Sequence, residues 1–218
     1  MILINIYLLE TVRWIWITSS SSSKEQDSLI NVIELEEAVD EFSNKDYGIH
    51  YLVIYPDLTT LKGFYSHYIQ KSIEEKNEVV QIAPFYEIVD SVRHTLSEGH
   101  RAIKDMEKLE SEKSLIIVDS LKNYTKSEQK ESDLSFKENM VNHAKKIGKN
   151  GFSILGDMGA FYFNGRTQDL VDYELSLPTK YDIDLKGFCL YHKDDFNRLT
   201  REQRQKLAVH HGRTIIIK

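Results

Sequence analysis

The chain is poor in cysteine: Cys189 is the one cysteine among 218 residues. A single cysteine excludes an internal disulfide and a zinc site built from several cysteines. Because no disulfide framework demands an oxidising compartment, a cytoplasmic location is the default expectation.

A glycine-rich phosphate loop is also absent. Residues 51–56 have the pattern of a buried strand that runs straight into a helix. In nucleotide-hydrolysing α/β domains, such a strand precedes a glycine-rich loop whose N–H groups and lysine hold the phosphates. Here residues 56–62 contain no glycine, and the carboxylate of Asp57 stands where a phosphate would sit. The sequence therefore favours binding or sensing over nucleotide hydrolysis.

Positive charge is in short supply as well. The 28 lysines and arginines are outnumbered by 34 aspartates and glutamates, which gives a net charge of −6. Proteins that bind nucleic acids usually present a basic stripe, and the lysines and arginines here form no cluster beyond what a solvated helix face carries. We therefore expect no direct nucleic-acid partner.

The first 27 residues differ from the rest of the chain. Residues 1–18 are strongly apolar, but they include Glu10 and Arg13 and fall short of the roughly 20 residues that span a membrane. They also lack the basic start and small-residue cleavage pattern of a signal peptide. The segment fits an interfacial anchor, an element packed on the domain, or translated residues without a structural role. We expect residues 1–27, which end in a serine-rich linker, to be poorly ordered, with no membrane association, and 28–218 to form one domain.

From residue 28 onward, helical and strand patterns alternate. This alternation predicts an α/β fold of three layers, in which a mostly parallel sheet carries helices on both faces. Residues 115–118 have the most continuous apolar run and are expected to form a core strand buried on both faces. Residues 102–108 fit a minor strand or an irregular segment, and 121–134 a mobile loop that could cover a site. Further strands are expected at 47–55, 79–83, 152–155, 187–191 and 213–217, and helices at 29–42 (with a strand-like start), 59–76, 86–96, 136–147, 167–177 and from 200.

Ligands of open α/β sheets bind beyond the carboxyl ends of the strands. That rule selects the polar residues at the predicted strand ends: Tyr55 and Asp57, Asp119 and Ser120, Asp157 and Met158, Tyr191 and His192. Asp119 ends an apolar strand, as does the aspartate that holds Mg²⁺ in nucleotide hydrolases, but a helix-capping aspartate has the same pattern.

Two further segments contain candidate ligand-binding residues. Residues 156–159, Gly-Asp-Met-Gly, fit either a loop whose glycines let the backbone approach a ligand or a plain strand-to-helix turn. Glu174 lies in a predicted helix between Leu170 and Leu177. A buried Glu174 would be a ligand or network residue because a buried carboxylate needs partners, but we favour a solvent-exposed position.

No metal motif is visible. The eight histidines form no H-x-x-x-H or H-E-x-x-H pattern, and the adjacent His210 and His211 would point in different directions on a helix. Cys189 lies in a predicted core strand, where a free cysteine usually acts as a small inert hydrophobe. We therefore expect no metal and no cofactor.

Taken together, these landmarks resemble the MEDS sensory domain, a family named for methanogens, methylotrophs and a dichloromethane regulator. The resemblance spans roughly residues 48–217. It is carried by His50-Tyr51 with Val53 and Tyr55, Phe64-Tyr65, Asn77-Glu78, residues 115–119, residues 156–159, Tyr173-Glu174, residues 188–191 and His210-His211.

The resemblance implies a degenerate relative of the RecA/KaiC-like ATPase fold that senses hydrocarbon derivatives or other small signals. Such domains occur beside histidine kinases and DNA-binding regulators and also alone, often in archaea. Residues 28–218 leave no room for an output domain, so the implied partner is a separate kinase or transcription regulator. The chain departs from the family at Asp157, where relatives often have glutamate in a Gly-Glu-Met sequence.

Three functions fit the sequence. The leading one is a non-catalytic sensory or ligand-binding domain in signal transduction. The alternative is a RecA/KaiC-like nucleotide-binding protein or ATPase with an atypical phosphate site, in which Asp119 and Asp157 surround a metal. The third is a structural adaptor similar to an inactive ATPase subunit. Self-association into a homo-oligomer is compatible with each of them, and the sequence identifies neither the ligand nor the partner.

Overall fold

The computed structural model describes residues 30–124 and 132–218. The predictions for residues 1–27, and for the central part of the loop expected at 121–134, therefore lie outside the described residues.

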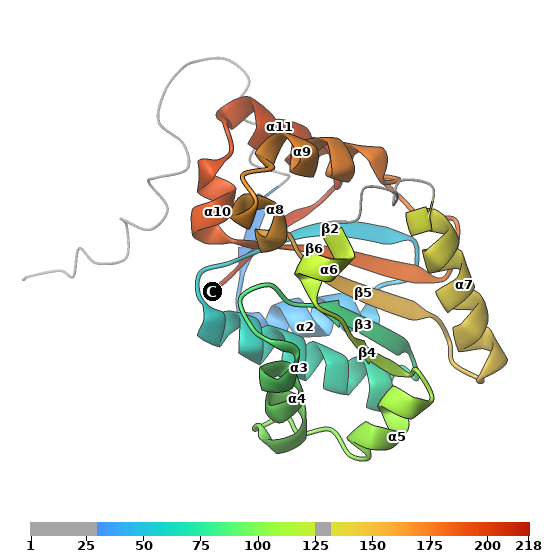
Figure 1. Ribbon diagram of the computed structural model, residues 1–218. Helices are drawn as coiled ribbons and strands as arrows, with labels where there is room; N and C mark the ends of the chain where they lie inside the picture. The colour runs from blue at the N-terminus through green and yellow to red at the C-terminus, as the bar shows by residue number, and fades with distance from the viewer. Residues whose placement is uncertain (1–29, 125–131) are drawn as a thin grey trace, which may run out of the picture.

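The described residues form one sheet of seven strands, all parallel, in the order β1-β7-β2-β6-β5-β3-β4 (Figure 1). This confirms the predicted α/β class, and the sheet is fully rather than mostly parallel. The strands are β1 (Ile30–Ile33), β2 (Ile49–Tyr55), β3 (Val79–Ala83), β4 (Leu115–Ile117), β5 (Phe152–Asp157), β6 (Leu185–His192) and β7 (Thr214–Ile217).

Helices cover both faces of the sheet, as Figure 1 shows, with α2 to α5 on one side and α7 to α11 on the other. The helices are α2 (Leu35–Asn44), α3 (Leu58–Glu74), α4 (Val89–Glu98), α5 (Met106–Ser111), α6 (Ser120–Tyr124), α7 (Ser132–Lys146), α8 (Gly159–Phe163), α9 (Thr167–Ser176), α10 (Lys193–Arg198) and α11 (Arg201–His210).

Strand β6 shows how the sequence divides between the two cores. Successive side chains of a strand point to opposite faces of the sheet. Phe188 and Leu190 accordingly join the core under α2 and α3, while Cys189 and Tyr191 join the core under α8 to α11. Because both faces are covered, almost every residue of β6 is buried, and polar side chains on this strand have to find partners inside the protein.

Several predicted elements need correction. Residues 29–42 contain the separate elements β1 and α2. Residues 102–105 are irregular, as one of the two interpretations of 102–108 held, and α5 begins at Met106. The prediction that 115–118 form a core strand buried on both faces is wrong, because β4 is the edge strand beyond β3 and two of its three residues are only half-buried. Of the predicted loop 121–134, residues 121–124 belong to α6 and α7 begins at residue 132.

The final helix begins as the sequence predicts. Thr200 caps α11 by accepting a hydrogen bond from the Gln203 N–H, and the Gln203 side chain accepts one from the Thr200 N–H. This reciprocal capping box satisfies two of the N–H groups that a helix start otherwise leaves unpaired.

Among residues 30–124 and 132–218, there is no helix with the length and apolar character that crossing a membrane requires.

Candidate functional site

The turn after β2 has its phosphate-binding position occupied by the chain's own carboxylate, that of Asp57. Asp57 precedes α3, and its Oδ1 accepts a hydrogen bond of 2.8 Å from the Thr60 N–H. This hydrogen bond is the largest of the causes that lower the pKa of Asp57. Nearby on α3, the Lys62 ammonium lies 3.0 Å from a carboxylate oxygen of Glu87. The helix terminus that would bind a phosphate is therefore already occupied by an anion, as the sequence predicted.

A buried acid lies at the carboxyl ends of the central strands. Asp157 ends β5, two strands away from β2, and its Oδ2 accepts a hydrogen bond of 2.9 Å from the Tyr55 hydroxyl. The Gly159 N–H donates to Oδ1 at 2.9 Å. Complete burial raises the pKa of Asp157 to about 7 even though these donors oppose the rise. Near neutral pH, this carboxyl group is present both with and without its proton.

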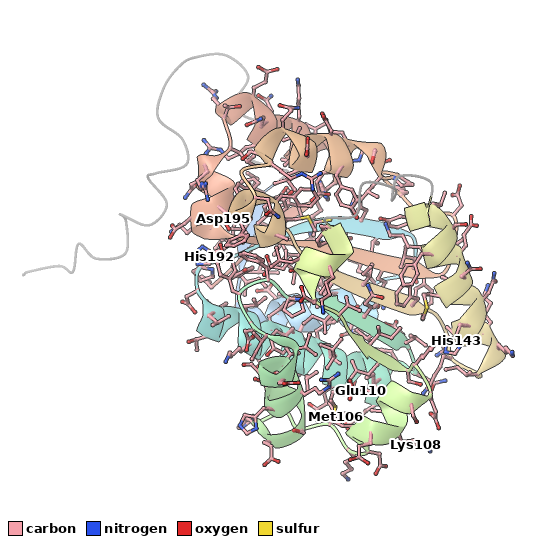
Figure 2. All side chains as sticks on the ribbon, viewed as in Figure 1. Met106, Lys108, Glu110, His143, His192 and Asp195 are labelled. Atoms are coloured by element: carbon pink, nitrogen blue, oxygen red, sulfur yellow. The ribbon has the colours of Figure 1, made fainter. Side chains whose placement is uncertain are left out.

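A second acid–phenol pair lies beside the first. The Tyr86 hydroxyl donates to Oδ2 of Asp195, a buried residue of α10. The ring of His192, at the end of β6, lies 5.4 Å from the Tyr55 ring and 5.4 Å from the Tyr86 ring, measured between centroids. Figure 2 shows His192 and Asp195 close together near α10. We call Tyr55, Tyr86, Asp157, His192 and Asp195 the strand-end site.

Aromatic side chains extend this site to the surface. The Phe85 ring lies 4.9 Å from the Tyr86 ring and 5.9 Å from the Phe163 ring. Phe163 is 71% exposed and Tyr86 is 41% exposed. A continuous series of rings thus leads from solvent to the buried Tyr55–Asp157 pair.

The structure separates several residues that the sequence grouped. Asp119 follows the edge strand β4 and accepts a hydrogen bond from the Lys122 N–H at 3.3 Å, which fits the helix-capping interpretation. Strand β5 extends through Asp157, so Gly156 and Asp157 belong to a strand rather than to a loop. The glycines at 156 and 159 make room for the Tyr124 and Phe85 side chains, which a Cβ would overlap.

Three predicted ligand-binding residues are fully buried and do not belong to the strand-end site. Met158, Glu174 and Tyr191 all belong to the core between the sheet and helices α8 to α11 or line it. The preference for a solvent-exposed Glu174 is wrong. Its Oε1 accepts a hydrogen bond of 2.6 Å from the Tyr191 hydroxyl, so the buried carboxylate has the partner that burial demands.

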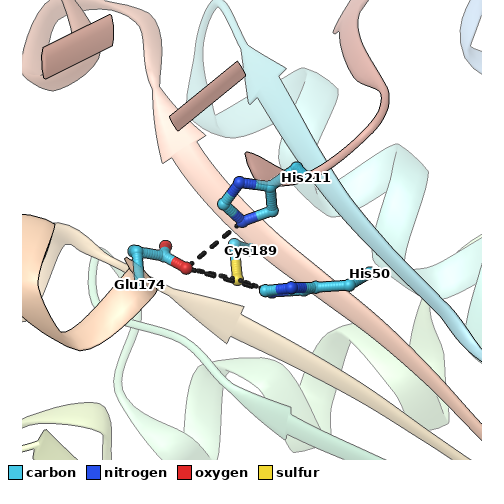
Figure 3. A group of neighbouring side chains, drawn as sticks. All are labelled: His50, Glu174, Cys189 and His211. Atoms are coloured by element: carbon cyan, nitrogen blue, oxygen red, sulfur yellow. Dashed lines mark hydrogen bonds and ion pairs between the residues drawn. The ribbon is translucent and has the colours of Figure 1, made fainter. Parts of the chain in front are cut away.

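Glu174 also belongs to a cluster that the sequence did not predict. Figure 3 shows the side chains of His50, Glu174, Cys189 and His211 pointing toward one another. They come from β2, α9, β6 and the end of α11, and all four are buried. One ligand atom from each residue lies within 4.8 Å of the other three, and no other group of this kind occurs in the described part of the chain. We call these four residues the buried cluster.

The distances within the buried cluster are short. The Cys189 Sγ lies 3.3 Å from His50 Nε2 and 3.2 Å from Glu174 Oε2. The Glu174 Oε2 atom lies 3.2 Å from His211 Nε2 and 3.9 Å from His50 Nε2. The contact between His211 Nε2 and Glu174 Oε2 is short enough for a hydrogen bond, but its direction does not fit one.

Burial and neighbouring groups set the charges of this cluster. Burial is the largest cause that lowers the pKa of His50 to about 3, and His211 and Lys137 lower it further, so the His50 ring is neutral. Burial alone would raise the pKa of Glu174, but His211, His50 and Tyr191 together outweigh it and bring that pKa to about 2. The ionised Glu174 carboxylate and the neutral His50 ring therefore lie side by side in a water-excluded core.

Sequence reasoning missed the buried cluster because its members are far apart in the chain. Metal motifs are recognised by short spacings, such as two histidines four residues apart on a helix. Here the spacings are 124, 15 and 22 residues, counted from positions 50, 174, 189 and 211. The available signals were indirect: a histidine and a cysteine in predicted core strands, and a glutamate between two leucines of a helix.

No protein-family model matches this chain, and a search of curated proteins finds no significant relative.

Proposed function

We propose that this chain is a non-catalytic sensory domain that binds a small organic molecule at the strand-end site. The observation that carries the proposal is the occupied phosphate-binding position in the turn after β2. Asp57 caps α3 and Lys62 pairs with Glu87. The helix N–H groups and the lysine that would hold a triphosphate therefore already have partners within the chain. The strand ends, where open α/β sheets bind ligands, instead present phenols, carboxyl groups and an imidazole.

The residues of the strand-end site define the chemistry of the ligand. The exposed rings of Tyr86 and Phe163 and the half-buried ring of Phe85 suit an apolar group. The His192 imidazole and the Tyr86 hydroxyl suit one or two hydrogen bonds. Asp157 and Asp195 disfavour an anion nearby because like charges repel. The ligand class is therefore a small, partly apolar molecule that is uncharged or cationic.

The buried carboxyl group of Asp157 gives the protein a way to respond to ligand binding. A ligand that contacts His192 or Tyr86 alters the surroundings of the Tyr55–Asp157 pair, whose carboxyl group changes charge near pH 7. The resemblance to MEDS sensory domains supports a role in signal transduction through a separate protein, a kinase or a transcription regulator.

A ligand screen tests this proposal. The full chain is purified, compounds that copurify with it are identified by native mass spectrometry, and thermal shifts are measured with short alcohols, amides, amines and Mg·ATP. We expect stabilisation by at least one neutral or cationic organic compound and none by Mg·ATP. His192→Gln and Tyr86→Phe should weaken that binding about tenfold each, the loss expected for one hydrogen bond or ring contact.

The control is His94→Gln, which changes an exposed histidine of α4. It should leave every thermal shift unchanged. Stabilisation by Mg·ATP accompanied by phosphate release would contradict the proposal and favour the ATPase alternative. Binding of an organic compound that survives both strand-end variants would place the ligand elsewhere.

A further inference from the structure

We propose that the buried cluster of His50, Glu174, Cys189 and His211 is a binding site for one divalent transition-metal ion, of which Zn²⁺ fits best. This site is separate from the strand-end site and does not depend on the proposed sensory function. Imidazole, thiolate and carboxylate are the ligands from which proteins build four-coordinate zinc sites.

The separations between the ligand atoms match a tetrahedral site. Zinc bonds to nitrogen, oxygen and sulfur of about 2.0–2.3 Å place neighbouring ligand atoms of a tetrahedron roughly 3.3–3.6 Å apart. The four separations given above run from 3.2 to 3.9 Å, and all four atoms lie within 4.8 Å of one another. Four of the six separations are thus close to tetrahedral values, and the remaining two, which reach at most 4.8 Å, shorten by up to about 1 Å when the atoms surround one ion.

The backbone fixes both imidazoles in the orientation that a metal requires. His50 Nδ1 lies 2.9 Å from the carbonyl oxygen of Pro178, and His211 Nδ1 lies 2.8 Å from that of Leu207. A carbonyl oxygen can only accept, so each Nδ1 carries a hydrogen and each Nε2 is the ring nitrogen that faces the cluster. Metal-binding histidines are held in this way by an outer hydrogen bond on the other ring nitrogen.

One ligand atom has a close charged neighbour but no well-aligned hydrogen bond inside the protein. His211 is completely buried, yet its Nε2 forms no hydrogen bond although it lies 3.2 Å from Glu174 Oε2. A buried nitrogen without a partner costs free energy. Two atoms that lie close together without being aimed at each other are expected when both are aimed at a third position, that of the ion.

The charges of the cluster balance a divalent ion. A Cys189 thiolate and a Glu174 carboxylate supply two negative charges, and two neutral imidazoles complete the shell, so the occupied site is neutral. Neutrality matters because an unbalanced charge in a buried site is expensive. The Tyr191 hydroxyl donates to Glu174 Oε1, which leaves Oε2 for the metal. Lys137 adds a positive charge nearby, with its Nζ 5.5 Å from the centroid of the Tyr181 ring.

The Cys189–His50 contact could also suggest a nucleophilic thiol. A catalytic thiolate has to be reachable by its substrate, and Cys189 is buried in the core beneath α9 and α11. The shallow groove between these two helices is lined by Leu175 and His210, each next in sequence to a cluster residue. None of the four cluster residues lines this groove, and a sealed thiol with three other metal ligands around it does not fit an enzyme's nucleophile.

The test uses the full chain and Zn²⁺ and Co²⁺ as probes. The protein is purified without chelator, its metal content is measured, and it is then stripped and reconstituted with each ion. We expect one equivalent of Zn²⁺ or Co²⁺ per chain and a melting temperature roughly 10 °C higher with metal than without. The Co²⁺ form should show tetrahedral visible bands and a thiolate-to-cobalt charge-transfer band. Because Cys189 is the one cysteine, that band identifies its ligand even without a variant.

Variants separate metal binding from folding. Cys189→Ser should remove the charge-transfer band, and His211→Gln should weaken Co²⁺ binding at least 100-fold. The matched control is His210→Gln, which changes the neighbouring histidine that lies outside the cluster and should keep full binding. If the folded wild-type chain retains no Co²⁺ or Zn²⁺ after gel filtration, or if bound Co²⁺ gives no thiolate band, the proposal is overturned.

Discussion

Lys186→Met should lower the free energy of unfolding by about 3–5 kcal/mol, the largest loss that we expect from any single change of a charged residue in this protein. Lys186 lies on β6 and is buried, and its Nζ lies 2.7 Å from Oε1 of Glu78, which is also buried. Removing the ammonium group leaves the Glu78 carboxylate without its counter-charge in a low-dielectric core. The loss is measured by urea unfolding followed by circular dichroism.

Further hydrogen bonds hold the Lys186–Glu78 pair in place. Lys186 Nζ also donates to the Ser43 carbonyl oxygen at 3.1 Å, and Glu78 Oε2 accepts from the Ser153 hydroxyl at 2.8 Å. Ser153 in turn shares a hydrogen bond of 2.9 Å with Tyr68. This network joins α2, β5, β6 and α3, so its disruption should lower the cooperativity of unfolding as well as the stability.

A double variant and a surface lysine serve as controls. Lys186→Met combined with Glu78→Gln removes both charges and should recover a large part of the loss. Lys206→Met breaks the exposed pair with Glu202 and should cost no more than about 0.5 kcal/mol. A loss at Lys186 as small as that at Lys206 would contradict the view that burial makes this pair important.

Asp157→Asn should change the pH dependence of stability. The pKa of Asp157 is raised from 3.8 in the unfolded reference to about 7 in the folded protein. The folded state therefore binds this proton more tightly than the unfolded state does, and the resulting stabilisation is complete below pH 4. It is lost as the pH rises from about 4 to 7. At about 1.4 kcal/mol per pKa unit, the loss amounts to roughly 4 kcal/mol.

Asparagine carries no such titration. The unfolding free energy of Asp157→Asn relative to wild type should therefore rise by roughly 4 kcal/mol between pH 4 and pH 8, with the change concentrated between pH 4 and 7. The groups that face Asp157 are the Tyr55 hydroxyl, the N–H groups of Gly159 and Phe85, and the carboxylate of Asp195. All of them stay in the variant, so the difference isolates residue 157.

The exposed aspartate of α9 provides the matched control. Asp172→Asn makes the same chemical change on the surface and should show no comparable trend with pH. If the difference between Asp157→Asn and wild type stays constant from pH 4 to pH 8, the carboxyl group is not perturbed by burial, and its proposed role in registering a ligand fails.

The sequence predicted the fold where apolar patterns decide the structure. The alternating helices and strands predicted the parallel sheet, and the helix expected from residue 200 begins at Arg201. It misjudged β4, because a short apolar run has the same pattern at the edge of a sheet as at its centre. Strand order depends on which strands pair across long loops, and a single sequence does not reveal that pairing.

In the candidate site, too, the sequence predicted residues marked by apolar strands and missed those that strand pairing brings together. Asp57 and Asp157 were predicted because each follows or ends an apolar strand, whereas Asp119 had an equal pattern and follows the edge strand β4. The partners Tyr86 and Asp195 were missed because β3 and β6, which bring them together, lie more than 100 residues apart in sequence. The buried cluster was missed for the same physical reason, since its four ligands meet only after the sheet has formed.

The most direct test of the account is a calorimetric titration of the full chain with Mg·ATP. Because Asp57 occupies the start of α3 and Lys62 is paired with Glu87, we predict no saturable binding with a dissociation constant below about 1 mM. Saturable binding of Mg·ATP that Asp57→Ala strengthens would agree with a closed but usable phosphate site and would contradict the account.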